Sequence, residues 1–312
     1  GWEAIFACGG ETLATVPALA ESSHRSVLLH EDGQVAAQLK EMAPAGCDLL
    51  LVDDYNLGAA FETPLRGWAR FIAVIDDLAD REHDCDLLVD VSLGRRAADY
   101  AGLVPKACRL LIGPEQALLR PQFAGQRSAA LARRKSRVDR ILVSLGGTDP
   151  FGLVELALAG VAASRVRLAV DVVTGFLPES HPERLERAIG SLDVRKLSNV
   201  SDMAGLMVEA DLAIGAGGGS AWERCCLGLP TLMIVTAENQ RLQAEALADC
   251  GAAVLVGRKG AISASDIAAA INSIVADEAR LKAMTTTAAA LCDGLGATRV
   301  VASLEDLTTR KA

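Results

Sequence analysis

Residues 215–224 read Gly-Ala-Gly-Gly-Gly-Ser-Ala-Trp-Glu-Arg, and this stretch says more about the fold than any other part of the chain. Residues 210–214 form a short, mostly apolar run typical of a buried strand, and residues 221–227 favour a short helix that ends at Gly228. A glycine-rich turn between a strand and a helix lets a ligand approach the bare backbone, whose free N–H groups favour an anion. The stretch therefore predicts a site for a phosphate or a diphosphate.

The same turn also has a purely structural interpretation. Ser220 and Glu223 have the Ser-x-x-Glu spacing of a capping box, in which the two side chains satisfy helix N-terminal donors. Four of the residues 215–219 are glycine, which is more than a cap requires and favours a phosphate turn. The pattern is not the dinucleotide motif Gly-x-Gly-x-x-Gly, because position 220 is serine and no acidic residue follows about twenty positions later at the end of a second strand.

Length and composition indicate two α/β domains. The 312 residues suffice for two domains of about 150 residues each. Since 51% of the residues are hydrophobic and only 4% are aromatic, the core is aliphatic, which suits parallel sheets covered by helices. The net charge of −9 argues against nucleic acid and against an anionic membrane surface as partners. No run of about 18 apolar residues occurs, so we expect neither membrane insertion nor a signal peptide.

The cysteines and histidines predict no metal site. The 8 cysteines contain no Cys-x-x-Cys pair and mostly lie beside apolar residues, which is typical of buried reduced thiols in a cytosolic protein. The 4 histidines lack the spacing of metal ligands. We therefore expect a cytoplasmic protein with neither a metal nor a cofactor.

Strand-like runs alternate with helical segments along the chain, which predicts parallel sheets with right-handed crossovers. The expected strands are residues 4–8, 26–29, 48–52, 71–75, 87–89, 110–112, 141–144, 170–173, 194–197, 212–214, 231–235 and 253–256. The basic stretch 124–140 separates two such series and is interpreted as a solvated helix and linker. We expect domains at residues 1–130 and 136–295, a C-terminal helix at 296–312, and a ligand cleft between the domains at the carboxyl ends of strands.

Polar residues gather where several expected strands end. Gly146 and Gly147, within residues 144–150, either permit close backbone approach to a ligand or form a tight turn. Residues 53–55 and 76–77 carry acidic pairs, which by themselves are often helix caps. Residues 238–240, Glu-Asn-Gln, either cap a helix or meet the hydroxyl and amide groups of a sugar.

Together these motifs resemble the UDP-2,4-diacetamido-2,4,6-trideoxy-β-L-altropyranose hydrolases of pseudaminic acid synthesis. The resemblance covers almost the whole chain, with its motifs in the right order and spacing. It rests on residues 52–55, 75–81, 83–86, 113–114, 118–120, 144–150, 215–231 and 238–240. More distantly, the chain is similar to the peptidoglycan N-acetylglucosaminyltransferases. The resemblance thus implies the GT-B architecture, in which two Rossmann-like domains face each other across a cleft.

The resemblance implies a metal-independent UDP-sugar hydrolase that acts as a monomer, in which water attacks the anomeric carbon and UDP leaves. It implies Tyr55 and Asn239 as catalytic residues, with Tyr55 facing the sugar. Glu223 would bind the ribose, residues 199–203 would cradle the uracil, and the glycine-rich turn would stabilise the diphosphate. The implied substrate-binding residues are Gly146, Gly147, Val200, Gly217, Gly218, Gly219, Ser220, Glu223, Glu238 and Gln240.

The N-terminal part departs from the family pattern. The family opens with a strand and a Gly-x-Gly-His-x-x-Arg motif whose histidine is the proposed general base, whereas residues 1–7 look like the family's second strand. Residues 23–25, Ser-His-Arg, are no substitute. We therefore expect a chain truncated by about one βα unit, at a cost of about 10²–10⁴-fold in rate. Asp-Val-Ser at 90–92 and Gln116 also differ from the family and put the exact sugar in doubt.

Two other functions remain open at this point. One is a GT-B glycosyltransferase that moves a sugar from UDP to an acceptor other than water. A membrane-associated transferase would carry an apolar or basic docking patch on the first domain, and the sequence indicates none. The other is a non-catalytic UDP-binding relic, which the missing histidine favours.

Overall fold

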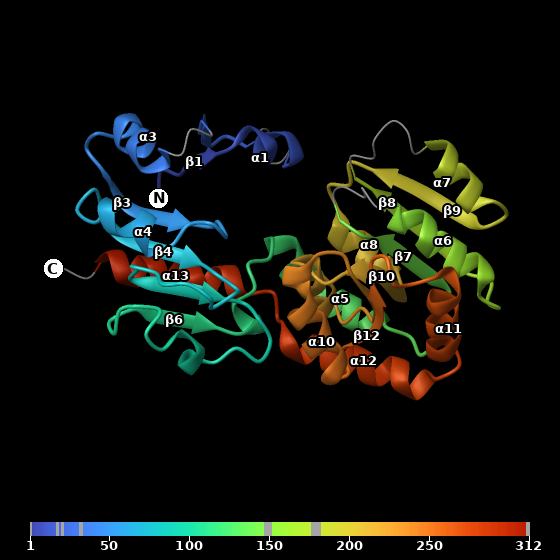
Figure 1. Cartoon of the computed structure of the whole chain (residues 1–312). Coiled ribbons are helices and arrows are strands. Elements are labelled where there is room, and N and C mark those ends of the chain that lie inside the picture. Colours follow the sequence, from blue (N-terminus) through green and yellow to red (C-terminus); the bar gives the residue numbers. More distant parts are fainter. Residues whose placement is uncertain are drawn as a thin grey trace. The chain divides into compact units, whose positions relative to one another are not determined.

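The computed structural model describes residues 2–16, 19, 22–30, 34–146, 152–175 and 182–309 (Figure 1). The chain divides into two units. Unit 1 comprises Gly1–Asp90, Arg96–Leu111 and Ala302–Ala312, and unit 2 comprises Val91–Arg95 and Ile112–Val301. Each unit contains a parallel sheet with helical connections, as the alternation of strand-like and helical segments predicts. The residue limits of the two expected domains stay a prediction.

Unit 2 is built on a 6-stranded sheet in the order β12-β11-β10-β7-β8-β9. Every neighbouring pair in this sheet is parallel. The strands are β7 (Arg140–Ser144), β8 (Ala169–Thr174), β9 (Asp193–Ser198), β10 (Leu212–Ala216), β11 (Thr231–Val235) and β12 (Ala253–Arg258). The chain first runs from β7 outward to β9, then returns to the other side of β7 with β10.

Both faces of this sheet are buried, which explains the continuous apolar runs in its strands. On β7, Ile141 and Val143 belong to one hydrophobic cluster, whereas Leu142 between them belongs to another.

The helices of unit 2 are α5 (Pro121–Arg133), α6 (Leu153–Ala163), α7 (Pro182–Ile189), α8 (Met203–Glu209), α9 (Ser220–Cys226), α10 (Arg241–Asp249), α11 (Ala264–Val275) and α12 (Glu278–Leu291), with short 3₁₀ turns η3 (Pro114–Gln116) and η4 (Glu238–Gln240). The last helix, α13, spans Gly296–Thr309.

Unit 1 contains a 4-stranded sheet in the order β3-β4-β5-β6 and a separate 2-stranded parallel sheet, β1-β2. The strands are β1 (Ile5–Cys8), β2 (Arg25–Leu28), β3 (Cys47–Val52), β4 (Ala69–Ile75), β5 (Leu87–Asp90) and β6 (Arg109–Ile112). The helical segments are α1 (Gly10–Thr15), α3 (Val35–Met42), α4 (Ala59–Glu62), η1 (Thr63–Leu65) and η2 (Ala97–Tyr100). Strand β5 is wholly buried, and β3 pairs only with β4 within the described part of the chain.

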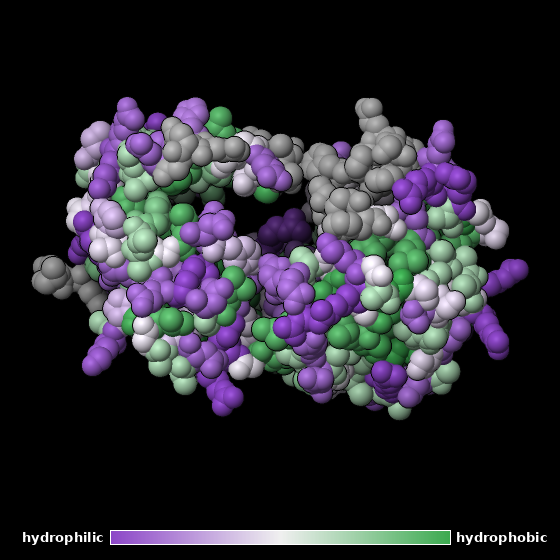
Figure 2. Space-filling model, viewed as in Figure 1, coloured by the Kyte–Doolittle hydropathy of each residue, from purple (hydrophilic) through white to green (hydrophobic). Residues whose placement is uncertain are grey.

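Large apolar side chains are exposed in and beside the strands of unit 1. They include Trp2, Ile5, Phe6, Leu28 and Leu51, and Leu28 is 50% exposed. Hydrophobic residues are visible at the surface in Figure 2. Individual exposed apolar side chains are normal on a protein surface, so the expectation that the first domain carries no apolar or basic docking patch stays a prediction.

The basic stretch 124–140 is interpreted above as a solvated helix and linker, and it does contain the end of α5 and the exposed Lys135 and Arg137, but Arg127 and Arg134 are partly buried. Arg127 donates hydrogen bonds to the carbonyls of Ala289 (2.7 Å) and Cys292 (3.0 Å). Arg134 donates to the carbonyls of Met207 (2.8 Å) and Leu227 (3.0 Å), and its burial lowers its pKa to about 10. These carbonyls lie at or beyond helix ends, where backbone acceptors need partners. The arginines therefore bind α5 to the rest of unit 2.

Candidate functional site

Three of the predicted motifs start at one edge of the unit 2 sheet. In the pairing of β10 with β7, Gly215 lies opposite Ser144, and in its pairing with β11, Ala216 lies opposite Ile234. Because parallel strands end at the same edge, the turns that follow β7, β10 and β11 begin side by side. The strand order reverses between β7 and β10, and α/β sheets bind ligands at such a switch point.

The glycine-rich turn after β10 presents its carbonyl groups to α10. The side chain of Gln243 donates to the carbonyl oxygens of Gly217 (2.6 Å) and Gly218 (3.3 Å). Since a trans peptide holds C=O and N–H on opposite sides, the N–H groups of Gly218 and Gly219 point away from α10. Neither N–H makes a hydrogen bond to any of the residues that the structure describes. Two backbone donors therefore face the same side of the turn.

Three of the four glycines are closely packed. A Cβ at Gly215 would lie 2.7 Å from the guanidinium of Arg224, one at Gly217 would lie 3.1 Å from the carbonyl oxygen of Gln240, and one at Gly218 would lie 3.2 Å from the Gln240 side chain. A Cβ at Gly219 would meet no atom within 4 Å. Gly219 is thus the position at which the turn is open to a ligand.

The capping-box interpretation of the turn is wrong. Helix α9 begins at Ser220, its N-cap is Gly219, and no side chain makes a cap hydrogen bond. The Ser220 hydroxyl instead accepts from Arg224 (3.0 Å), which lies one turn further along the helix. A capping box needs its serine at the N-cap, but Ser220 is already the first residue of the helix. The Ser220 oxygen also accepts from the Arg224 guanidinium instead of from a backbone N–H of the first turn. The two residues of the predicted box are therefore available for other roles.

Glu223 faces Arg120 rather than the start of its own helix. The Arg120 guanidinium lies 3.7 Å from a Glu223 carboxylate oxygen, and it also lies over the ring of Phe123. Burial raises the pKa of Glu223, whereas the positive charges of Arg120 and Arg224 oppose this shift. The side chain is 19% exposed, so the carboxylate can still accept a hydrogen bond from a ligand hydroxyl.

The motif after β11 also caps no helix through its side chains. Neither η4 nor α10 has a side-chain cap hydrogen bond. Glu238 is paired with Arg241 (2.7 Å), which lowers the pKa of the Glu238 carboxyl, and Asn239 is exposed. Gln240 accepts from the Thr236 hydroxyl (2.9 Å) and lies against Gly218. Gln240 is therefore the member of this motif that the structure brings to the glycine-rich turn.

The remaining predicted residues of unit 2 lie on two further loops. Gly146 follows β7, is exposed, and has a φ of 111°, a conformation that favours glycine. Gly147 lies outside the described residues. Val200 follows β9 and is half-buried, next to Asn199 with its positive φ of 51°. Asp202 then caps α8 by accepting from the N–H of Gly205 (2.8 Å), which fixes the start of that helix.

Tyr55 belongs to unit 1, on the loop after β3. Its ring is exposed, and its hydroxyl donates to a carboxylate oxygen of Asp77 (3.3 Å) on the loop after β4. The predicted acidic pair at residues 76–77 is thus no helix cap. Asp77 contacts the tyrosine, and Asp76 is buried behind it.

A clamp around Arg81, which sequence reasoning missed, holds the Tyr55 loop. Arg81 donates to the carbonyls of Leu57 (2.9 Å) and Asp54 (3.2 Å), and it forms an ion pair with Asp76 (2.8 Å). Asp76 in turn accepts from the hydroxyl of Tyr100 (2.8 Å), a buried side chain whose pKa is raised by burial. The only signal in the sequence is that residues 76–81 match the family motif. The clamp positions the tyrosine by fixing its backbone on both sides.

His83 lies behind this clamp and is a core residue. Its Nδ1 is 2.7 Å from a carboxylate oxygen of Glu62, and both side chains are fully buried. The other Glu62 oxygen accepts from the N–H of Asp84 (2.5 Å). A histidine without exposed surface cannot serve as a base toward a ligand in this structure.

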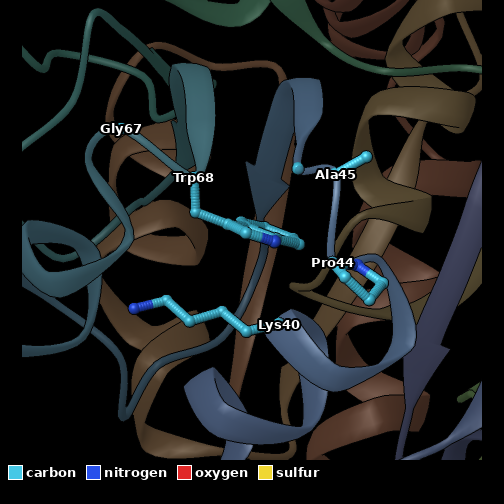
Figure 3. A pocket seen from close by; sticks show the side chains of 6 residues that line it. Lys40, Pro44, Ala45, Gly67 and Trp68 are labelled. Carbon is cyan, nitrogen blue, oxygen red and sulfur yellow. The ribbon is translucent and has the colours of Figure 1, made fainter.

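A hollow in unit 1 does not involve the predicted site residues. It is lined by Lys40, Pro44, Ala45, Gly46, Gly67 and Trp68 (Figure 3). The Trp68 indole donates to the carbonyl of Ala43 (2.7 Å), and the Lys40 ammonium donates to the carbonyl of Pro64 (2.8 Å). Because its polar groups are satisfied by the backbone, this hollow is a structural junction between α3 and the turn before β4.

The described residues were compared with the patterns of metal sites and of membrane-spanning helices. They contain no cluster of three or more histidine, cysteine or acidic side chains arranged to hold a metal ion. Nor do they contain a helix that is long and apolar enough to cross a membrane.

Comparison with known proteins identifies the family. The profile of the glycosyltransferase family 28 C-terminal domain matches residues 141–299, which contain the sheet edge described above. The chain belongs to this family. Over 97% of its length it is also similar in structure to MurG from Acinetobacter baumannii, with a TM-score of 0.59, 16% sequence identity and 98% of that chain covered. The predicted fold class, GT-B, is confirmed.

Two curated relatives are similar in sequence. The spore coat polysaccharide biosynthesis protein SpsG of Bacillus subtilis is 34% identical over 203 residues, which cover 64% of this chain and 59% of SpsG. The UDP-2,4-diacetamido-2,4,6-trideoxy-β-L-altropyranose hydrolase of Campylobacter jejuni is 31% identical over 104 residues, which cover 33% of this chain and 36% of the hydrolase. The chain thus matches less than two thirds of the length of either relative.

The packing of the turn makes a prediction about stability. We expect Gly215→Ala to lower the free energy of unfolding by about 1–3 kcal/mol, because its Cβ would overlap the Arg224 guanidinium. Gly219→Ala adds a Cβ that meets nothing, and we expect it to change stability by less than about 0.5 kcal/mol. Urea denaturation of both variants measures the difference, and equal losses of stability would contradict the packing described here.

Proposed function

We propose that the protein binds a UDP-sugar through unit 2 and hydrolyses it at the anomeric carbon. The observation that carries this proposal is the glycine-rich turn at the switch point, where the N–H groups of Gly218 and Gly219 face one side and Gly219 is open. Membership of a glycosyltransferase family supports a sugar nucleotide as the ligand. The sequence similarity to a UDP-sugar hydrolase supports water as the acceptor.

In the proposed reaction, the oxygen of a water molecule attacks the anomeric carbon and forms the new C–O bond. The bond between that carbon and the diphosphate oxygen breaks, UDP leaves with the electron pair, and the water loses a proton to solvent or a base. The leaving diphosphate gains negative charge during this step. The backbone donors of Gly217, Gly218 and Gly219 and the Ser220 hydroxyl would stabilise that charge without a metal ion or a cofactor.

The nucleoside half has its own proposed contacts in unit 2. Glu223 would accept hydrogen bonds from the ribose hydroxyls, because its carboxylate is half-buried beside Arg120 and keeps free acceptor capacity. The loop around Val200 would hold the uracil through backbone groups. Gly146 and Gly147 would let the loop after β7 approach the phosphates or the sugar closely.

The motif after β11 and the loop after β3 are each proposed to contact the sugar. Asn239 is exposed after β11 and Gln240 lies against the glycine-rich turn, so both are proposed to contact the sugar, with Glu238 beside them. Tyr55 is proposed to face the sugar from unit 1, with its hydroxyl held by Asp77 and its loop held by Arg81. The resemblance to the hydrolases further suggests a diacetamido-trideoxy sugar and a role in pseudaminic acid synthesis.

A glycosyltransferase is the second candidate. The family description and the similarity to SpsG, a polysaccharide biosynthesis protein, favour it. The two candidates share the UDP site and differ in whether water or another hydroxyl attacks. A UDP-binding relic without activity would share the site as well.

UDP release separates these possibilities. The chain is incubated with a UDP-diacetamido-trideoxy sugar, and UDP and free sugar are quantified by chromatography. We expect equimolar UDP and free sugar without any added acceptor. UDP release only with an acceptor would favour a transferase, and bound UDP without turnover would favour a relic. Absence of UDP binding in calorimetry would contradict the proposal altogether.

The environment of Glu223 predicts how uridine binding depends on pH. The ionised carboxylate accepts the ribose hydroxyls, and burial raises its pKa above the ordinary range of a glutamate. As pH falls through this raised pKa, the carboxylate becomes protonated, and uridine affinity should fall while the protein stays folded. Glu223→Gln should bind uridine more weakly at neutral pH and show no such dependence between about pH 5 and 8. An unchanged pH profile in the variant would exclude Glu223 from the ribose site.

A further inference from the structure

Arg224 is a fully buried cation beneath the glycine-rich turn. It lies on α9, is 1% exposed, and donates to the Ser220 hydroxyl (3.0 Å) and to the carbonyl of Ala216. Its Nε has no hydrogen-bond partner among the described residues. The guanidinium therefore contacts the turn at both ends, at Ala216 and at Ser220.

No acidic side chain in the described part of the chain forms an ion pair with Arg224. The neighbouring Glu223 contributes favourable charge but has Arg120 at 3.7 Å as its own ion-pair partner. The half-buried Arg140 and the exposed Arg195 both contact the buried Asp171 at 2.8 Å, whereas Arg127 and Arg134 donate to backbone carbonyls. A buried charge without an ion-pair partner is costly. The burial of Arg224 lowers its pKa to about 10, so it stays protonated at neutral pH.

The surrounding sequence keeps the guanidinium in this place. A Cβ at position 215 would lie 2.7 Å from the Arg224 guanidinium, so a larger residue there would displace this side chain. The Ser220 hydroxyl has one donor and two acceptor sites. Since Arg224 donates to its oxygen, the Ser220 proton is left to donate elsewhere, and the exposed side of the turn is where an acceptor can approach.

We propose that Arg224 is a positioning residue for the diphosphate of the ligand, acting through Ser220 and through its own charge. Its donation to the Ser220 oxygen turns the hydroxyl into a donor toward an anionic oxygen, and its bond to the Ala216 carbonyl holds the start of the turn. In the low dielectric beneath the turn, its positive charge offsets that of a bound anion. The site therefore selects a nucleoside diphosphate over an uncharged nucleoside. This inference rests on the proposed UDP site.

The test compares the affinities for UDP and for uridine by calorimetry in the full chain. Wild type should bind UDP more tightly than uridine. Arg224→Met should lose about 10–100-fold in UDP affinity and little in uridine affinity, because it removes a charged donor near the diphosphate only. Arg134→Met is the matched control, since Arg134 is also a buried arginine of unit 2 with a pKa lowered to about 10 but contacts helix-end carbonyls instead of the turn. The control should keep the wild-type ratio of the two affinities.

A double-mutant cycle tests the route through Ser220. Ser220→Ala should weaken UDP binding in wild type and should have a much smaller effect in the Arg224→Met background. Arg224→Lys keeps the charge and should restore part of the affinity, and it replaces Arg224→Met in the cycle if the latter does not fold. Equal losses for UDP and uridine, or additive effects of the two substitutions, would overturn the inference. Failure of wild type to bind UDP would instead overturn the proposed function.

Discussion

The pairing of β10 with β7 is the constraint on which the site depends. It places Gly215 opposite Ser144 at the point where the strand order of the unit 2 sheet reverses. As a consequence, the loops after β7, β10 and β11 begin at one edge, although they are separated by up to about 90 residues in sequence. Both faces of the sheet are covered by hydrophobic clusters, so this edge is where polar backbone groups can meet a ligand.

Side chains from α9, η4 and α10 pack against the turn after β10 and determine its conformation. Gln243 binds its carbonyls, Gln240 lies against Gly218, and Arg224 fills the space behind Gly215. These contacts fix which way the peptide groups point, and the donors of the turn are held in place before any ligand arrives. Preorganised donors stabilise a developing negative charge more effectively than donors that must first reorient. Helix α9 has only seven residues, so the peptide groups and the buried cation matter more here than a helix dipole.

Much of the fold follows from local sequence. Each expected strand overlaps an observed strand. In the unit 2 sheet this follows because central strands buried on both faces read as continuous apolar runs between turn residues. The loops that carry the predicted site residues follow these strands, and their role in binding stays a prediction. What local sequence cannot provide is the partner of a charged side chain. Arg127 binds a carbonyl 165 residues away, and Arg224, a residue of α9, binds back to Ser220 and to the carbonyl of Ala216. The capping box failed because that same arginine occupies the Ser220 oxygen.

Hydrogen–deuterium exchange with and without UDP tests the central claim most directly, because it reports on backbone N–H groups along the whole chain. The account predicts that UDP slows exchange in peptides that cover residues 215–226, with a smaller effect of uridine on the same peptides. Slower exchange confined to other loops, with residues 215–226 unchanged at saturating UDP, would contradict the assignment of the glycine-rich turn as the diphosphate site.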